Sequence, residues 1–325
     1  MKNYLKNISL FHKNRKVINH KILIIGRGRW SQIIINELNS NFPNLEKIFV
    51  FSSKFKQKKN KNKKIIFINS LDSLKKQNIK YIIIANKNSD HLKYIKLFLR
   101  NKNNILCEKP LVISKKKLIN LESRIKKDKC FLMVSMQFFY AFYFNFINKN
   151  LVKNKKIKKI IIDWFDKKNE KRKGIIKKHD LKINFIEDIF YHIYSALYLL
   201  ADIKEYSFEQ KPLTEKKRVK LIFFTNNKIK TILNSSRNYS HRSRIIKIYF
   251  NNENCLFLNF SKDGNIRAKL NGKTVKIPSV LMSKTIKYQL YFFLKQRKND
   301  KKIELNNFLN LKKFFKNLYL LKKKL

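Results

Sequence analysis

Short apolar runs alternate with amphipathic segments along the first 130 residues of the chain. Five runs rich in Ile, Leu and Val have the length of β-strands; they span residues 21–25, 48–51, 65–68, 81–85 and 105–107. Segments with helical spacing of apolar residues follow them and cover residues 30–38, 71–77, 91–101 and 115–127. Nearly continuous apolar strands that alternate with helices are typical of a parallel sheet buried on both faces. The pattern therefore predicts a doubly wound α/β domain.

The pattern changes after residue 130. It predicts a strand over residues 157–165 and a strongly apolar helix over 183–200. Several strand-like runs then follow one another, with turns such as Asn271-Gly272, whose residues tolerate positive φ. These features predict an antiparallel meander, and two further helices close the chain. We therefore expect an N-terminal extension, a Rossmann domain and an α+β domain, over residues 1–20, 21–130 and 131–325 respectively.

Length and charge refine this picture. The chain has 325 residues, of which 44% are hydrophobic, so it can bury two cores. A net charge of +55 suggests a nucleic acid or an anionic membrane as partner. However, 64 of the 76 basic residues are Lys and only 12 are Arg, and they are spread along the whole chain. This composition is typical of an AT-rich genome, whereas binding of phosphate favours the Arg fork. We therefore expect no specific nucleic-acid partner.

Cysteines and apolar stretches indicate the compartment. Cys107, Cys130 and Cys255 are an odd number without close spacing, which fits a reducing environment. The basic first 16 residues contain no uninterrupted apolar core, so we expect no secretory signal. The most apolar stretch, 131–147, is shorter than the roughly 20 residues that span a bilayer. We read it as a buried strand running into a helix or loop, and expect a cytoplasmic chain without a membrane span.

The first chemical signal is a glycine motif between the first predicted strand and helix, with the sequence Gly26-Arg27-Gly28-Arg29-Trp30-Ser31. Gly26 permits a tight turn, and Gly28 lets the backbone approach a pyrophosphate at the helix N-terminus, where free N–H groups attract an anion. Ser31 stands where the third glycine of the fingerprint is usual, and it is small enough for close helix–strand packing. The motif predicts a dinucleotide site.

The end of the second predicted strand indicates which dinucleotide. NAD sites usually carry an acidic residue there, which binds the ribose 2′-hydroxyl. This chain has Ser52, Ser53 and Lys54 instead, and two hydroxyls with a cation suit a 2′-phosphate. We therefore predict that NADP(H) is preferred, with NAD(H) as the alternative.

A second motif follows the fifth predicted strand. Glu108 and Lys109 stand at the carboxyl end of that strand, the edge at which open parallel sheets bind their ligands. Pro110 ends the strand because it lacks an N–H donor. A lysine at this edge can bind a substrate hydroxyl or carbonyl and stabilise developing negative charge on its oxygen. A plain solvated Glu–Lys pair is the alternative.

A third motif lies on the long apolar helix. Asp188 and His192 are four residues apart and therefore share one helix face. A histidine held by a carboxylate is a suitable general acid or base near neutral pH. A structural Asp–His hydrogen bond is the alternative. No metal-ligand pattern accompanies these residues, so we expect no metal.

Taken in order, these motifs resemble the Gfo/Idh/MocA family of glucose–fructose oxidoreductase and inositol dehydrogenase-like enzymes. The resemblance rests on Gly26-x-Gly28, Asn86 with His91, Glu108-Lys109-Pro110 and Asp188-x-x-x-His192. It implies NAD(P)-dependent oxidation or reduction of a sugar, a cyclitol or a related small molecule. It also implies a Rossmann domain followed by an open, mainly antiparallel sheet, through which such proteins often form homo-oligomers.

The resemblance implies a role for each residue by position. Lys109, Asp188 and His192 form the catalytic set, and we expect the Lys109 ammonium and the His192 imidazole to meet across a cleft over the pyridine ring. Glu108 and Asn86 lie beside the nicotinamide and its ribose, and His91 braces the helix after the fourth strand. Gln137 faces the substrate. Apart from the resemblance, Tyr191 is an aromatic candidate for the substrate pocket wall, with core packing as the alternative.

The chain departs from the family at the third motif. Phe190 stands between Asp188 and His192, where a small residue is usual, and Ser195 stands where an acidic residue is common. Bulk at this point implies a reshaped substrate site, or one that has lost activity. Two alternatives therefore stay open: a catalytically altered Rossmann protein that binds nucleotide or nucleic acid, and a reductase of an imine or a carrier-linked intermediate.

Overall fold

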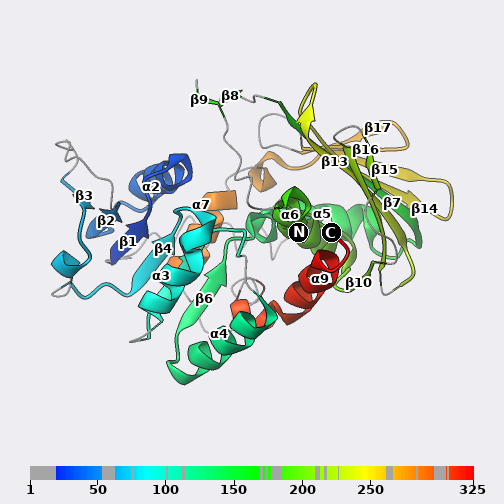
Figure 1. The fold of residues 1–325 in the computed structure, drawn as a ribbon. Helices are drawn as coiled ribbons and strands as arrows, with labels where there is room; N and C mark the ends of the chain where they lie inside the picture. The colour runs from blue at the N-terminus through cyan, green and yellow to red at the C-terminus, as the bar shows by residue number, and fades with distance from the viewer. Residues whose placement is uncertain are drawn as a thin grey trace. The chain divides into compact units, whose positions relative to one another are not determined.

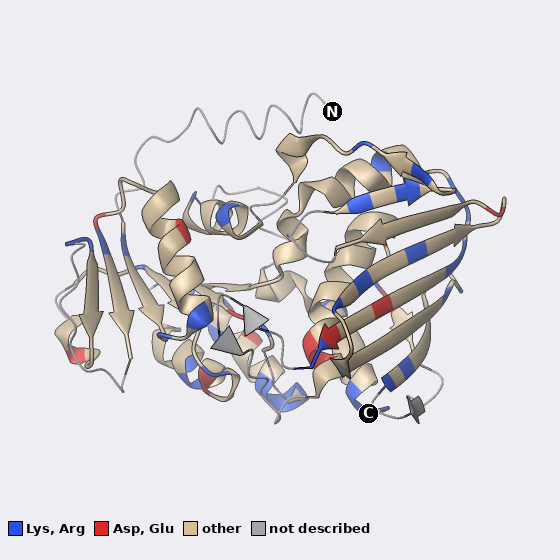
Figure 2. Ribbon diagram, turned by 90° about the horizontal axis from the view of Figure 1, so that it is seen from above, with Lys and Arg blue, Asp and Glu red and all other residues tan. Residues whose placement is uncertain are grey.

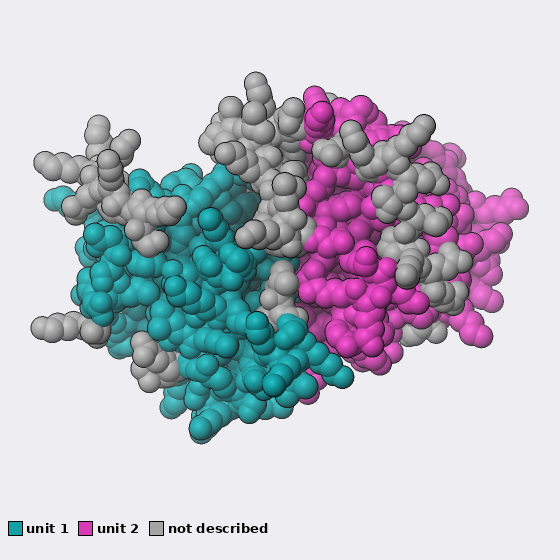
Figure 3. Space-filling view, in the orientation of Figure 1, with its two compact units in different colours: residues 1–140, 285–311 teal, residues 141–284, 312–325 magenta. Residues whose placement is uncertain are grey.

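The computed structural model of the chain divides into two compact units, shown in Figure 3. The first contains residues 1–140 and 285–311, and the second contains 141–284 and 312–325. The structure describes residues 20–52, 63–74, 77–99, 102–111, 114–168, 171–172, 175–176, 184–208, 213–215, 218–225, 227–260, 266–282, 285–295, 305 and 307–325. The expected N-terminal extension lies almost entirely outside the described residues.

The first unit is built on a six-stranded parallel sheet with the order β3-β2-β1-β4-β5-β6. Its strands are mostly Ile, Leu, Val and Phe, as expected for a sheet covered on both faces. This order confirms the predicted doubly wound fold, and it reverses between β1 and β4, where such sheets bind their ligands. The strands are β1 (Lys21–Ile25), β2 (Lys47–Phe51), β3 (Ile65–Ile68), β4 (Tyr81–Ile84), β5 (Asn104–Cys107) and β6 (Phe131–Val134).

Helices of the first unit come from both ends of the chain (Figure 1). Those of the N-terminal part are α2 (Arg29–Asn41), α3 (His91–Phe98) and α4 (Lys115–Lys127), with 3₁₀ turns η1 (Asp72–Leu74), η2 (Asn88–Asp90) and η3 (Gln137–Tyr140). Helix α7 (Thr285–Lys295) and turn η6 (Phe308–Asn310) come from the C-terminal part, and α7 contacts α2 and η3. The first unit therefore extends beyond the boundary that was expected at residue 130, because β6 completes the parallel sheet. It also includes α7, which packs on it from the C-terminal part of the chain.

The second unit is built on a nine-stranded sheet with the order β10-β12-β13-β7-β14-β15-β16-β17, in which β11 also pairs with β12. The mainly antiparallel sheet confirms the predicted fold class, but β7 lies between β13 and β14 and runs parallel to β13. The expected meander is therefore split by a strand that precedes it in sequence. The strands are β7 (Ile157–Lys167), β10 (Tyr206–Ser207), β11 (Leu213–Glu215), β12 (Arg218–Thr225), β13 (Lys230–Tyr239), β14 (Ser243–Phe250), β15 (Cys255–Asn259), β16 (Arg267–Leu270) and β17 (Lys273–Val275).

Helices cover one face of this sheet (Figure 1). Helix α6 is the longest of those described, and the Asn184 side chain caps it by accepting the Ile186 N–H at 2.9 Å. Its aromatic side chains pack with those of α9, where Phe314 contacts Phe190, Tyr191 and Tyr194. The elements are α5 (Phe142–Ile147), the π-helical turn η4 (Asn148–Val152), α6 (Phe185–Ala201), η5 (Ser279–Leu281) and α9 (Lys312–Lys322), with a separate hairpin of β8 (Lys171–Arg172) and β9 (Ile175–Ile176).

Residues 131–147 form strand β6, turn η3 and helix α5, as the sequence predicted. No helix within the described ranges has the length and apolar character needed to span a membrane. The three cysteines are free thiols, and Cys107 and Cys130 are buried.

Candidate functional site

The turn after β1 needs glycine at position 26. Gly26 has a φ of +118°, and a Cβ built there lies 2.8 Å from the Ala85 carbonyl oxygen. Its N–H donates to the Phe51 carbonyl at 2.9 Å, which ties the turn to the end of β2. The absence of a side chain therefore lets the chain pass directly over β4 at the point where the sheet order reverses.

Gly28 has a different role. It precedes α2 with an ordinary φ of −70°, and a Cβ built there meets nothing within 4 Å. Among the described residues, no side chain caps α2 and its first turn holds no acidic residue. The first N–H groups of α2 are therefore open to an anion, and Arg29 and the half-buried Trp30 belong to this first turn.

Ser31 holds α2 against the sheet. Its side chain is fully buried, and its hydroxyl donates to the Ala85 carbonyl at 3.0 Å. This is the close helix–strand contact expected at the third position of the motif. Ser31 therefore supports the candidate anion site through packing, and Gly28 and the helix N-terminus are the groups that an anion would meet.

Asn86, directly after β4, supports the fit of a dinucleotide. Its Oδ1 atom is buried and has no hydrogen-bond partner among the described residues. A buried acceptor without a donor is rare in proteins and often marks the place of a bound group. A ribose hydroxyl would supply the donor, so the residues at the switch point fit the nucleotide that the motif predicts.

The end of β2 is described only as far as Ser52, which is half-buried and whose N–H donates to the Ile68 carbonyl at 3.2 Å. Ser53 and Lys54 lie outside the described residues. Among the residues described at this strand end, none is acidic.

Glu108 lies at the end of β5 in a buried polar network. Its Oε1 accepts the Ser135 hydroxyl at 2.7 Å, and the same hydroxyl oxygen accepts Gln289 Nε2 from α7 at 3.1 Å. Burial raises the pKa of the Glu108 carboxyl, while the nearby Trp30 indole, the Ser135 hydroxyl and Lys109 act in the opposite direction. The network fixes this carboxyl beside the first turn of α2.

Lys109 follows and is half-buried, and a cis peptide bond joins it to Pro110. His91, at the start of α3, is 1% exposed, and its Nδ1 lies 3.3 Å from the Pro110 carbonyl oxygen. Burial lowers the pKa of His91 to about 4, so the ring is neutral and its Nδ1–H donates to that carbonyl. His91 thus links α3 to the segment that carries Lys109.

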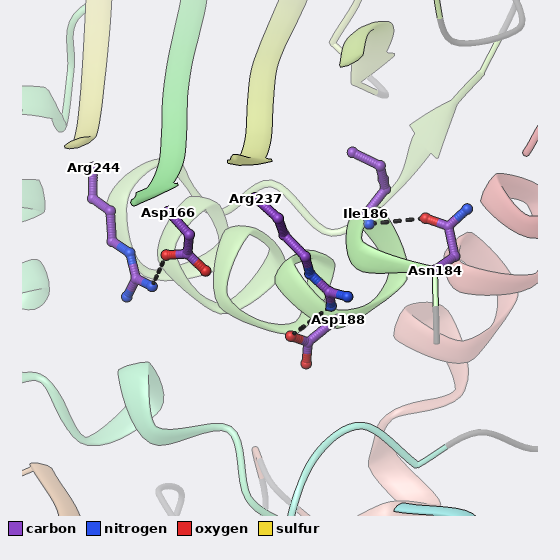
Figure 4. A network of polar contacts seen from close by, with 6 residues as sticks. All are labelled: Asp166, Asn184, Ile186, Asp188, Arg237 and Arg244. Carbon is purple, nitrogen blue, oxygen red and sulfur yellow. Dashed lines mark hydrogen bonds and ion pairs between the residues drawn. The ribbon is translucent and has the colours of Figure 1, made fainter. Parts of the chain in front are cut away.

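The second unit positions Asp188 and His192 on α6, both half-buried. Asp188 Oδ2 pairs with Arg237 of β13 at 3.5 Å, as Figure 4 shows. The His192 ring stacks on Trp164 of β7, with the two centroids 5.6 Å apart. The two side chains therefore share one helix face, as predicted, and each meets a residue at the same end of the sheet.

Trp164 has a second charged neighbour. Arg244 of β14 lies over the indole, with its guanidinium carbon 4.5 Å from the ring centroid. The same guanidinium donates to Asp166 Oδ1 at 2.9 Å, as Figure 4 shows. Trp164 and Asp166 share one face of β7 because they are two residues apart. Charged and aromatic groups thus gather at this end of the sheet, whereas Ile160 and Ile162 further along the same face are fully buried and apolar.

The two substrate candidates have different surroundings. Gln137, in η3 of the first unit, is half-buried. Tyr191 is 0% exposed, and its ring packs against Phe314 at 4.6 Å. The packing between α6 and α9 therefore accounts for Tyr191 without a ligand.

Sequence patterns did not point to the residues that support these groups. Ser135 and Gln289 are separated by 154 positions and meet only through the fold. Arg237 and Arg244 could have been noticed in the sequence, because Arg is rare in a chain whose basic residues are mostly Lys. Within the described residues, no group of three His, Cys, Asp or Glu side chains is placed to hold a metal ion.

The fold and the open helix N-terminus define the first unit as a dinucleotide-binding Rossmann domain. Residues 20–136 match the model of the Gfo/Idh/MocA family, described as an oxidoreductase family with an NAD-binding Rossmann fold. This match covers the Rossmann domain and agrees with the family that the motifs predicted. No curated protein matches the sequence.

Solved structures share the fold over nearly the whole chain. UDP-N-acetylglucosamine 3-dehydrogenase from Acidithiobacillus ferrooxidans has a TM-score of 0.71 at 12% identity, covering 95% of this chain and 98% of its own. A myo-inositol dehydrogenase from Corynebacterium glutamicum has a TM-score of 0.63 at 13% identity, covering 94% and 95%. A 3-ketoreductase from Actinomadura kijaniata, solved with NADP and TDP-benzene, has a TM-score of 0.66 at 13% identity, covering 85% and 89%. At these identities, the likeness establishes the fold.

Proposed function

We propose that this oxidoreductase transfers a hydride between a nicotinamide dinucleotide and a carbinol or carbonyl carbon of a small molecule. The observation that carries the proposal is the position of Glu108-Lys109 in the first unit. The segment follows β5, next to the β1–β4 switch point, and the Glu108 network holds it beside the first turn of α2. A lysine at the ligand-binding edge of the sheet has the chemistry that such a reaction needs.

The catalytic residues have separate tasks. The Lys109 ammonium polarises the substrate oxygen, and the His192 imidazole takes or returns the hydroxyl proton. Asp188, paired with Arg237, sets the charge on the helix face that carries His192. The cofactor, when bound, supplies the hydride or accepts it. Gly28, the N-terminus of α2 and Asn86 would hold the dinucleotide, whereas Ser31 and His91 support the site by packing.

NADP(H) is the preferred cofactor in this proposal. Hydroxyl and ammonium groups follow β2 at Ser52, Ser53 and Lys54, where NAD sites usually carry a carboxylate. The Actinomadura kijaniata structure of the same fold contains NADP, which supports this preference. NAD(H) remains the alternative.

The substrate class we propose is a sugar or a cyclitol, free or linked to a nucleotide. Structures of the same fold include a UDP-N-acetylglucosamine 3-dehydrogenase and a myo-inositol dehydrogenase, both named for the oxidation of a ring carbinol. Gln137 is retained as a substrate-binding residue. Tyr191 is left out because its ring belongs to the core.

A set of substitutions tests the chemistry. Oxidation of NADPH is followed with keto-sugars and nucleotide-linked keto-sugars, and reduction of NADP⁺ with the corresponding alcohols. Lys109→Ala and His192→Ala should each lower kcat at least about a hundredfold while NADPH binding persists. The double variant should lose little more than either single variant, because residues that act on one substrate are not additive.

Lys80→Ala is the control, because it removes the same charge just before β4, at the opposite edge of the sheet. Activity of the control should match the wild type. Full turnover by Lys109→Ala, or independent and multiplicative losses in the double variant, would overturn the assignment of these residues.

We also propose that two copies associate through the face of the second sheet that the helices leave uncovered. Alternate side chains on this face are apolar and half-exposed, and they include Ile161, Phe165, Ile222, Ile232, Ile245 and Phe257. Ile232→Lys, on the paired central strand β13, should shift the molar mass measured by light scattering to that of one chain. An unchanged mass would exclude this face.

The remaining expectations concern partners and location. Basic residues lie on strands and helices of both units, without gathering on a single element (Figure 2). This distribution supports the view that no specific nucleic acid is bound, and binding of RNA should disappear by about 200 mM salt. The free thiols support a reducing, cytoplasmic location.

A further inference from the structure

Arg27 reaches across the end of the second strand. It follows Gly26 directly after β1, and its guanidinium carbon lies 5.0 Å from the centroid of the Phe67 ring in β3. In the sheet, β2 lies between β1 and β3, and Phe67 is paired with Val50 of β2. The Arg27 side chain must therefore pass over the carboxyl end of β2 to make this contact.

This position matters for the nucleotide. In doubly wound sheets the ribose 2′-oxygen lies at the end of the second strand, where a carboxylate selects NAD and an arginine accommodates a 2′-phosphate. The N–H of Ser52, the residue after β2, donates to the Ile68 carbonyl, so its hydroxyl is the group that it can donate to a nucleotide. Arg27 brings a cation to the same edge from a different strand.

The contact with Phe67 suits a phosphate ligand. A guanidinium that lies over an aromatic ring is held in one plane, and its N–H groups point outward from its edge. Arg forms paired hydrogen bonds with phosphate oxygens, which an ammonium cannot do. Only 12 of the 76 basic residues are Arg, so the residue at position 27 stands out from the lysine background.

We propose that Arg27 is a specificity-determining residue that binds the 2′-phosphate of NADP(H), and that Phe67 is the platform that orients it. The proposal rests on the proposed function, because it requires a nucleotide at the switch point. Arg27, a residue of the glycine motif, thus adds to the preference for NADP(H) that we propose for the end of β2.

The test measures binding of two adenosine nucleotides, without turnover. Isothermal calorimetry compares adenosine 2′,5′-bisphosphate with adenosine 5′-monophosphate, at about 200 mM salt to suppress non-specific binding to the cationic chain. Arg27→Ala should weaken the bisphosphate about tenfold or more and the monophosphate less than about twofold, since a charge-assisted contact is lost only with the former. Phe67→Leu should reduce the selectivity about twofold to fivefold.

Lys47→Ala is the matched control, because it removes one positive charge at the opposite end of β2. It should leave the ratio of the two affinities unchanged. If the wild type prefers the bisphosphate and Arg27→Ala keeps that preference, the proposal is overturned while the proposed function stands. If the wild type binds both nucleotides equally, the proposal and the NADP preference fail together. If the wild type binds neither nucleotide, the proposed function itself fails.

Discussion

Gly26 and Gly28 belong to one motif, but glycine is needed at the two positions for different reasons. Gly26 is required by the backbone, because its φ is +118° and a Cβ at this position would lie 2.8 Å from the Ala85 carbonyl oxygen. Gly28 has a φ of −70° and open space around it, so folding does not require glycine there. The requirement at position 28 comes from the ligand, if an anion is to approach the helix N-terminus.

Substitutions separate the two constraints. Gly26→Ala should lower the free energy of unfolding by about 2 kcal/mol or more, through strain and overlap with the backbone of β4. Gly28→Asp should leave it unchanged or raise it by a few tenths of a kcal/mol, because Asp is a favoured N-cap residue. Urea denaturation measures both values. Equal destabilisation by the two variants would contradict the different roles assigned to these glycines.

His91 makes stability depend on pH. Its pKa falls from 6.5 in the unfolded chain to about 4 in the folded one, so the unfolded state binds more protons between these values. The contribution of His91 is therefore complete above about pH 6.5 and is lost as the pH falls toward 4, by about 3 kcal/mol at most.

The comparison variant is His91→Gln, which does not titrate in this range. The difference in unfolding free energy between wild type and variant should shrink as the pH falls from 7 to 4. This difference removes the contribution of general charge repulsion, which acts on both proteins. A difference that stays constant over this range would show that His91 is not buried as a neutral ring.

Among the secondary-structure elements, helix α6 and one end of the second sheet together position Asp188 and His192. Asp188 on α6 meets Arg237 of β13, and His192 on the same face stacks on Trp164 of β7. Helix α6 carries Asp188 and His192, and strands β13 and β7 carry the residues that contact them. We infer that Arg237 is a positioning residue, which acts on the reaction through Asp188.

Arg237→Met should therefore lower kcat about tenfold and leave the KM for NADPH unchanged, because the lost ion pair lies in the second unit. Arg218→Met is the matched control, because both arginines lie over an aromatic ring: Arg237 over Phe185 at 5.5 Å and Arg218 over Tyr239 at 4.9 Å. The control should keep the wild-type kcat. A loss of stability with unchanged kcat in Arg237→Met would reduce Arg237 to a structural role.

Elements that follow from local sequence could be predicted, whereas their neighbours in space could not. The apolar run that forms α6, the strands of the first sheet and the Asn271-Gly272 turn between β16 and β17 all follow from local periodicity and turn chemistry. The insertion of β7 between β13 and β14 depends on pairing across about 70 residues, for which the sequence of one chain carries no signal. The same reason hides the packing of α7 on the first unit.

The residues of the candidate site likewise divide into those that the sequence predicted and those that only the fold brings together. Gly26, Glu108, Lys109, Asp188 and His192 stand in motifs with recognisable spacing, so the sequence pointed to them. Their supports did not stand out, because Ser135 meets Gln289 across 154 positions and Arg237 is brought to Asp188 by strand β13. Tyr191 was predicted as an aromatic residue of the substrate pocket wall, but its ring is buried against Phe314.

At the scale of the whole molecule, the charge of +55 must be separated from the function. A chain this basic attracts any polyanion, including a phosphorylated cofactor, and such binding decreases steeply with salt. A specific dinucleotide site depends on Gly28 and the N-terminus of α2 rather than on the general field. The two sources of affinity therefore respond differently to salt and to a single substitution.

Calorimetric titration of the full chain with NADPH at about 200 mM salt tests whether a dinucleotide binds at the N-terminus of α2. We predict saturable binding at one site per chain, weakened about tenfold or more in Gly28→Asp, whose carboxylate repels the pyrophosphate while the fold is kept. Absence of saturable binding, or equal affinity of the variant and the wild type, would contradict a dinucleotide site at this helix.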